Sequence, residues 1–317
     1  MARDIKRVAI IGTGVIGASW SALYLAKGLD VVATDVSPTA KQYLQDFVDA
    51  AWPALERLGL APTADRARLT FEPDLEKAVA DCDLVQENGP ERLDFKRKLY
   101  DQLDTILGPD VIIASSTSGL TMSAIQSACT RHPERCVIGH PFNPPHLVPL
   151  VEVVGGETTS QDTIDRAMKF YAGLGKRAIH VRKEVPGHVA NRLSAALYRE
   201  VVHLIHEGVA DAGDVDAAIS WGPGLRWGIM GPNLLYHLGG GEGGIEHFFS
   251  QFTGPMTAWW RDLGNPELSP ETCQTIIKGV LDEAHGRSIQ DLAKYRDDIL
   301  LGLLALRADE LKTTQQQ

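Results

Sequence analysis

The stretch V-A-I-I-G-T-G-V-I-G, residues 8–17, places three glycines directly after a short β-branched run. In a turn between a strand and a helix, the first glycine permits a tight bend, and the second lets the backbone approach a pyrophosphate. The third lets the helix pack close to the strand. Amide groups at the start of such a helix also attract phosphate. The stretch therefore predicts a dinucleotide-binding turn made by Gly12, Gly14, Val15, Ile16 and Gly17.

Asp35 adds a second part of the same nucleotide signature. It closes the next β-branched run, D-V-V-A-T-D, and lies 18 residues after Gly17. A carboxylate at this place accepts hydrogen bonds from the ribose hydroxyls and would repel a 2′-phosphate. Asp35 therefore favours NAD over NADP as the cofactor.

The pattern of the chain changes near Pro186. Before this residue, β-branched runs alternate with amphipathic helical patterns, which is typical of βαβ units around a mostly parallel sheet. After it the patterns are helical only, and a capping box at residues 288–291 opens a long apolar terminal helix. We predict an α/β protein with an N-terminal Rossmann domain over residues 1–185 and an all-α domain over residues 186–317. The predicted strands are Arg7–Ile11, Asp30–Thr34, Leu69–Phe71, Leu84–Gln86, Val111–Ser115, Cys136–His140, Leu150–Val154 and Ala178–Val181.

The composition argues against several classes of partner. A formal net charge of −10 disfavours a nucleic-acid binder, because such proteins need a basic face. The four cysteines form no C-x-x-C pair, which indicates free thiols in a reducing compartment. No apolar run approaches the ~20 residues that cross a bilayer. We expect a soluble, cytoplasmic protein that binds neither nucleic acid nor membrane and has no metal site.

Four polar residues at the ends of successive elements indicate oxidation of a hydroxyl group. Ser118 follows one predicted strand, His140 ends the next, Glu152 lies in the one after, and Asn191 opens the first helix of the second domain. Removing hydride from a carbinol carbon requires a base for the hydroxyl proton, and histidine titrates near neutral pH. A glutamate on the far ring nitrogen would fix the tautomer. A serine hydroxyl and an asparagine amide can hold the substrate oxygen.

Four motifs together resemble the 3-hydroxyacyl-CoA dehydrogenase superfamily over about residues 8–209. They are S-T-S-G-L (116–120), G-H-P-F-N-P (139–144), L-V-E-V (150–153) and P-G-H-V-A-N-R (186–192). The resemblance implies a Rossmann domain followed by a helical domain that forms a homodimer. It implies His140 as base, Glu152 as its partner, and Ser118 and Asn191 as contacts of the substrate oxygen. It also implies that NAD is contacted by Asp35, Glu91, Lys96, Ser118 and Asn143.

The second half resembles one branch of that superfamily, the L-carnitine dehydrogenases, in the glycine-rich stretch from Gly222 to Phe248. The resemblance implies oxidation of L-carnitine to 3-dehydrocarnitine. Aromatic rings bind quaternary ammonium groups, and arginine binds carboxylates. L-Gulonate, short 3-hydroxyacyl-CoA esters and a non-catalytic, crystallin-like role remain as alternatives. The predicted substrate-binding residues are Arg192, Trp221, Arg226, Trp227, Tyr236 and Phe252.

Overall fold

The computed structural model describes residues 4–310 of the chain. By their internal contacts these residues divide into two compact units. The first takes in the chain up to Arg192 together with the segment from Ala293 onward. The second is the helical segment Leu193–Leu292.

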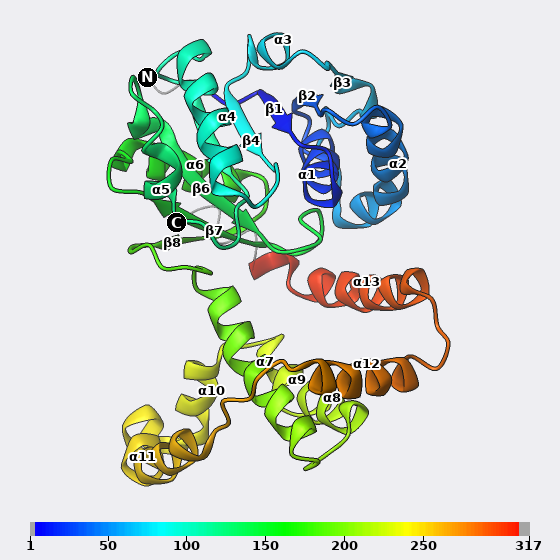
Figure 1. Ribbon diagram of the computed structural model, residues 1–317, viewed down its shortest axis with the longest axis vertical. Coiled ribbons are helices and arrows are strands. Elements are labelled where there is room, and N and C mark those ends of the chain that lie inside the picture. The colour runs from blue at the N-terminus through cyan, green and yellow to red at the C-terminus, as the bar shows by residue number, and fades with distance from the viewer. Residues whose placement is uncertain (1–3, 311–317) are drawn as a thin grey trace. The chain divides into compact units, whose positions relative to one another are not determined.

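The first unit is built on a single eight-stranded sheet (Figure 1). Its strand order, β3-β2-β1-β4-β5-β6-β7-β8, begins with the 3-2-1-4-5-6 order of dinucleotide-binding sheets. Neighbouring strands are parallel except for the antiparallel pair β6 and β7. All eight predicted strands are confirmed, with no end displaced by more than one residue. Their bounds are Arg7–Ile11 (β1), Asp30–Thr34 (β2), Leu69–Phe71 (β3), Leu84–Glu87 (β4), Ile112–Ser115 (β5), Cys136–Pro141 (β6), Leu150–Gly155 (β7) and Arg177–Val181 (β8).

Helices cover both faces of this sheet because its strands bury side chains on both sides. In β1, Val8 and Ile10 belong to one buried cluster, whereas Ala9 and Ile11 belong to the other. The alternation follows from the two-residue period of a strand. The first cluster includes α1, α2 and α6, and the second includes α3, α4 and α5. These helices are Val15–Ala26 (α1), Ala40–Leu58 (α2), Leu75–Val79 (α3), Leu93–Ile106 (α4), Met122–Gln126 (α5) and Gln161–Gly173 (α6).

The glycine turn after β1 has the backbone that its sequence requires. Gly12 has a φ of +83°, and a Cβ there would lie 2.7 Å from the carbonyl oxygen of Asn88. A Cβ on Gly17 would lie 1.9 Å from the carbonyl oxygen of Gly12. The helix begins at Val15, so Gly17 lies in its first turn.

The second unit is helical, as predicted for this part of the chain. Ser269 caps α12 by accepting a hydrogen bond from the Thr272 amide. The capping box at Ser288 is confirmed: its hydroxyl accepts from the Asp291 amide, and the Asp291 carboxylate accepts from the Ser288 amide, both at 3.1 Å. The helices after β8 are Ala190–His206 (α7), Ala212–Trp221 (α8), Pro223–Trp227 (α9), Pro232–Gly239 (α10), Gly244–Asp262 (α11), Pro270–Ala284 (α12) and Ile289–Leu306 (α13). Most of α13 belongs to the first unit, which takes in the segment from Ala293 onward.

The four cysteines are free thiols, as expected. Between residues 4 and 310, no helix is long and apolar enough to cross a bilayer. Over the same residues, no group of three or more histidine, cysteine, aspartate or glutamate side chains is arranged to hold a metal ion.

Candidate active site

The antiparallel pairing of β6 with β7 places His140 directly opposite Glu152. The histidine Nδ1 lies 2.8 Å from Glu152 Oε2, and both side chains are buried. Because a carboxylate oxygen accepts, the Nδ1 atom must carry the hydrogen. The Nε2 atom of a neutral His140 is then left unprotonated. This is the tautomer that a general base needs.

The second carboxylate oxygen of Glu152 is held by the start of α7. Its Oε1 atom accepts hydrogen bonds from the amides of Val189 and Ala190, each at 2.9 Å. Burial raises the pKa of Glu152, but the hydrogen bonds from His140 and from these two amides outweigh it and lower the pKa below its ordinary value. The carboxylate therefore remains ionised beside the imidazole.

Ser118 and Asn191 meet at the surface of the first unit. The Asn191 Nδ2 atom donates to the carbonyl oxygen of Ser118 at 3.3 Å. The Ser118 side chain is exposed, and that of Asn191 is partly exposed. This hydrogen bond ties the loop after β5 to the start of α7.

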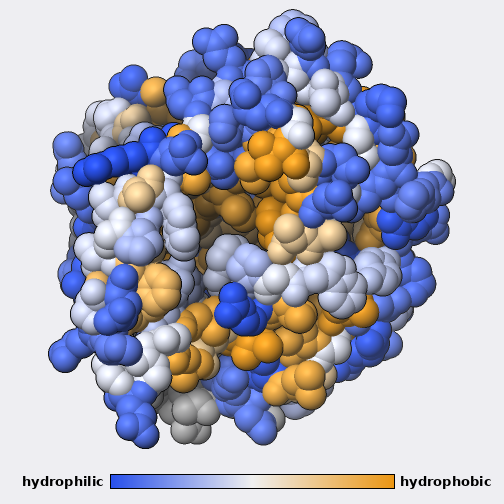
Figure 2. Space-filling model, turned by 90° about the horizontal axis from the view of Figure 1, so that it is seen from below, coloured by the Kyte–Doolittle hydropathy of each residue, from blue (hydrophilic) through white to orange (hydrophobic). Residues whose placement is uncertain are grey.

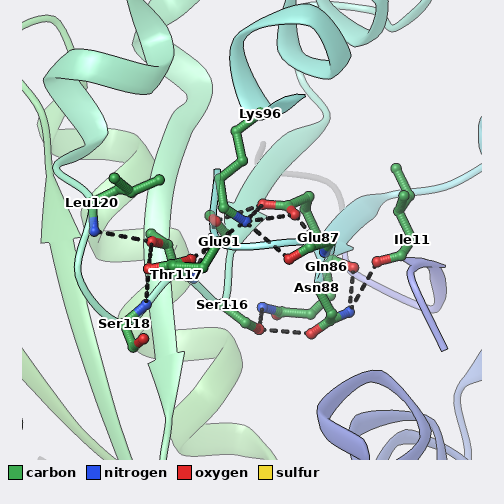
Figure 3. A network of polar contacts seen from close by, with 12 residues as sticks. Ile11, Gln86, Glu87, Asn88, Glu91, Lys96, Ser116, Thr117, Ser118 and Leu120 are labelled. Atoms are coloured by element: carbon green, nitrogen blue, oxygen red, sulfur yellow. Dashed lines mark hydrogen bonds and ion pairs between the residues drawn. The ribbon is translucent and has the colours of Figure 1, made fainter. Parts of the chain in front are cut away.

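Glu91 shapes the loop that carries Ser118 (Figure 3). Its Oε1 atom accepts from the Thr117 hydroxyl at 2.6 Å and from the amides of Ser118 and Gly119 at 3.0 and 2.8 Å. Burial raises the pKa of Glu91, but these three hydrogen bonds and the charge of Lys96 hold it below its ordinary value. Glu91 is therefore an anion that organises this loop.

Lys96 lies beneath this loop and not in the open part of the site. Its Nζ atom donates to both carboxylate oxygens of Glu87, at 2.8 and 2.9 Å, and both side chains are almost fully buried. The Glu91 carboxylate is 3.9 Å away. The amine thus neutralises a buried glutamate and supports Glu91.

Several polar residues of this network were not found from the sequence. Ser116 Oγ donates to Asn88 Oδ1 at 2.7 Å and accepts from Gln86 Nε2 at 2.9 Å. Asn88 Nδ2 in turn reaches the carbonyl oxygen of Ile11, at the end of β1 (Figure 3). The network links the glycine turn at residues 12–17, the nucleotide turn, to the loop after β5 that carries Ser118, the serine loop. The one available signal was position, because these residues end β4 and β5 at the carboxyl edge of the sheet.

The nucleotide turn opens onto a cavity of about 590 Å³, which Gly12, Gly14 and Asp35 help to line. A Cβ on Gly14 would meet no atom within 4 Å, so the backbone is open to a ligand there. The Asp35 carboxylate accepts from the Thr13 amide at 2.7 Å and from the Ser37 amide at 2.9 Å, which fixes it at the end of β2. The open turn and the fixed acid fit the pyrophosphate and ribose of NAD. Asn143 lies exposed in the loop between β6 and β7.

The predicted substrate-binding residues are spread over both units. Arg192 is exposed, and its Nη1 atom donates to the carbonyl oxygen of Pro186 at 3.4 Å. In the second unit, Tyr236 and Phe252 both stack on the buried ring of Phe248, with centroids 4.5 and 4.9 Å apart. The other three predicted residues, Trp221, Arg226 and Trp227, are exposed on α8 and α9.

A Rossmann sheet with a buried histidine–glutamate pair and an acid at the end of β2 is typical of NAD-dependent dehydrogenases. Residues 7–185 match the family model for the 3-hydroxyacyl-CoA dehydrogenase NAD binding domain, and residues 187–275 match the model for its C-terminal domain. The chain belongs to the 3-hydroxyacyl-CoA dehydrogenase family and is an NAD-dependent oxidoreductase.

Relatives with high sequence identity are similar over nearly the whole chain. The L-carnitine dehydrogenase of Pseudomonas putida is 50% identical over 95% of this chain and 94% of its own. The L-carnitine dehydrogenase of Bacillus cereus is 47% identical over 96% of this chain and 93% of its own.

Among solved structures, an NAD⁺-dependent dehydrogenase of 5-formyl-3-hydroxy-2-methylpyridine 4-carboxylic acid has a TM-score of 0.81 at 31% identity, over 97% of this chain and 99% of its own. The 3-hydroxybutyryl-CoA dehydrogenase of Escherichia coli has a TM-score of 0.66 at 29% identity, over 87% of this chain and 57% of its own.

Proposed function

We propose that this protein oxidises the 3-hydroxyl group of L-carnitine to 3-dehydrocarnitine. The observation that carries the proposal is the His140–Glu152 dyad, held at 2.8 Å in a chain that is 50% identical to a curated L-carnitine dehydrogenase over 95% of its length. The dyad supports the chemistry, and the similarity, which extends through the helical unit, supports the substrate.

The chain's own residues have separate roles in the reaction. His140 Nε2 accepts the proton of the substrate hydroxyl, and NAD, when bound, would supply the acceptor for the hydride on the carbon that bears this hydroxyl. Glu152 stabilises the imidazolium that forms, through the bond to Nδ1. Ser118 and Asn191 hold the substrate oxygen as it changes from hydroxyl to carbonyl. Charge balances, because the alcohol loses one hydride and one proton.

The cofactor is held by the nucleotide turn and by residues around the serine loop. The turn from Gly12 to Gly17 would hold the pyrophosphate, and Asp35 would accept hydrogen bonds from the ribose hydroxyls. Ser118 and Asn143 would also contact NAD. Glu91 and Lys96 contribute mainly by shaping the serine loop, because the Lys96 amine is engaged by Glu87.

The helical part from residue 186 onward provides substrate recognition and the dimer contact. Tyr236 and Phe252 each use one ring face on Phe248 and remain about 40% exposed, so a second face is open to a trimethylammonium group. Trp221 and Trp227 add further rings, and Arg192 or Arg226 binds the carboxylate. We place the enzyme in the cytoplasm as a homodimer, with free thiols suited to a reducing compartment.

A substrate panel tests the proposal. NADH formation is measured with L-carnitine, L-gulonate, 3-hydroxybutyryl-CoA and 3-hydroxy-5,5-dimethylhexanoate, in which carbon replaces the carnitine nitrogen. We expect turnover of L-carnitine and strong discrimination against the neutral isostere, because only the cation attracts the ring faces. The variant Trp227→Leu should discriminate less. Equal efficiency on both compounds, or preference for the sugar acid or the thioester, would contradict the carnitine assignment.

A further inference from the structure

His188 is a buried histidine with an unusual backbone, and none of the roles above includes it. It has a φ of +50° and follows Gly187, which has a φ of +76°. A left-handed conformation is uncommon for residues other than glycine, although histidine adopts it more readily than most. Two such residues in succession turn the chain sharply just before α7 begins at Ala190.

This turn aims two backbone amides at the dyad. The backbone N–H groups of the next two residues, Val189 and Ala190, each donate a hydrogen bond to Glu152 Oε1. With this oxygen occupied, the other carboxylate oxygen faces His140 Nδ1. The conformation at His188 therefore helps to set the orientation of Glu152.

The His188 ring makes a second connection, to the serine loop. Its Nε2 atom lies 3.1 Å from the carbonyl oxygen of Thr117, so Nε2 must donate. Thr117 immediately precedes Ser118. The ring also lies beside His140, with centroids 5.2 Å apart. Burial and the hydrogen bond act in opposite directions, but burial is the larger effect and lowers the pKa of His188 below its ordinary value. A neutral His188 adds no charge beside the imidazolium that forms on His140.

We propose that His188 is a positioning residue of the dehydrogenase reaction, which sets the dyad through its backbone and the serine loop through its ring. The backbone turns the amides of residues 189 and 190 toward Glu152. The ring fixes Thr117, and with it the neighbouring Ser118. One residue thus aligns the proton acceptor with the loop that holds the substrate oxygen. The kinetic part of this proposal rests on the proposed function, whereas the structural part does not.

The backbone part is tested on the enzyme without substrate. Hydrogen exchange of the Val189 and Ala190 amides is compared in wild type, His188→Gly and His188→Val. Glycine adopts a left-handed conformation freely, whereas a β-branched residue there is strained. We expect slow exchange in wild type and His188→Gly and faster exchange in His188→Val. Equally slow exchange in all three would overturn the backbone role, whatever the substrate proves to be.

The ring part is tested by chemical rescue of His188→Gly. Loss of one hydrogen bond should lower kcat by about 10-fold, with NAD affinity unchanged. Added imidazole can fill the space and donate to the Thr117 carbonyl, so it should restore most of kcat. 1-Methylimidazole has no N–H group and should restore little. An undiminished kcat in His188→Gly, equal rescue by both compounds, or rescue by neither would overturn the role of the ring. If wild type oxidises no panel substrate, the proposed function fails, and the exchange experiment still decides the backbone role.

Discussion

The Glu152 carboxylate has both oxygens engaged, which makes the dyad sensitive to small changes at the residue scale. Replacing His140 with alanine removes the proposed proton acceptor and should lower kcat by about 10²–10⁴-fold, the usual range for a positioned base. In Glu152→Gln, the side-chain NH₂ group can donate to His140 Nδ1. This favours the tautomer with the hydrogen on Nε2, which cannot accept a proton, and should lower kcat within the same range. Single-turnover hydride transfer measures both. NAD affinity serves as the control and should stay within about 2-fold, because neither side chain lines the nucleotide cavity. Full single-turnover rates in either variant would contradict the dyad assignment.

Lys176, which has no proposed role in the reaction, makes the free energy of unfolding depend on pH. Its amine is buried and donates to the carbonyl oxygens of Pro145 and Val148. Burial, aided by the charge of Lys27, lowers the pKa of Lys176 to about 7. Between pH 7 and about 10.4 the unfolded chain binds a proton that the folded chain does not. The free energy of unfolding therefore rises with pH in this window and loses this contribution as pH falls through 7.

Lys176→Met isolates this effect, because methionine does not titrate. The variant lacks the two hydrogen bonds at every pH. The free energy of unfolding of wild type should therefore increase relative to that of the variant from pH 6 to pH 9. Urea unfolding of both proteins at pH 6, 7.5 and 9 measures the trend. A difference that stays constant across this range would contradict the lowered pKa.

At the scale of elements, the buried Lys96–Glu87 pair ties α4 to the end of β4. Removing one partner of such a pair leaves an uncompensated charge and costs about 3–5 kcal/mol. We therefore expect Lys96→Met to lower the free energy of unfolding of the cofactor-free enzyme by that amount. The double variant Lys96→Met/Glu87→Gln, which also removes the acid, should recover part of the loss. A cost below about 1 kcal/mol would instead assign Lys96 to cofactor contact alone.

The strands and the dyad could be predicted because their signals are local or periodic. Short β-branched runs mark the strands to within a residue. His140 and Glu152 lie on consecutive runs, which often pair. Glu87 and His188 were missed because their importance depends on partners on other elements of the fold, Lys96 and Ser115 for the first and Thr117 for the second. The stacking of Tyr236 and Phe252 on Phe248 could not be predicted, because it depends on how α10 meets α11.

At the scale of the whole molecule, the helical unit leaves an unusual amount of apolar surface uncovered. Its buried cluster contains four residues, Val201, Ile205, Ala212 and Val215. In contrast, Trp259 and Trp260 on α11 are 61% and 65% exposed. Successive residues on a helix point about 100° apart, so the two exposed rings together cover a wide sector of the α11 surface. The face of the molecule drawn in Figure 2 carries groups of hydrophobic side chains as well. Large exposed apolar side chains that lie next to one another on a helix are typical of an interaction site.

A second copy of the chain is the occupant that we expect for this surface, in a two-fold arrangement typical of soluble oligomers. Sedimentation at micromolar concentration should then give a dimer. Because a dimer dissociates as it unfolds, the denaturation midpoint should also rise with protein concentration. Trp260→Lys places a charge on the exposed face of α11 and should shift the equilibrium toward monomer, whereas Lys278→Gln, at an exposed polar position on α12, serves as the control. A monomer whose unfolding is independent of concentration would show that the helical unit is stable with its tryptophans in water, and would refute the dimer.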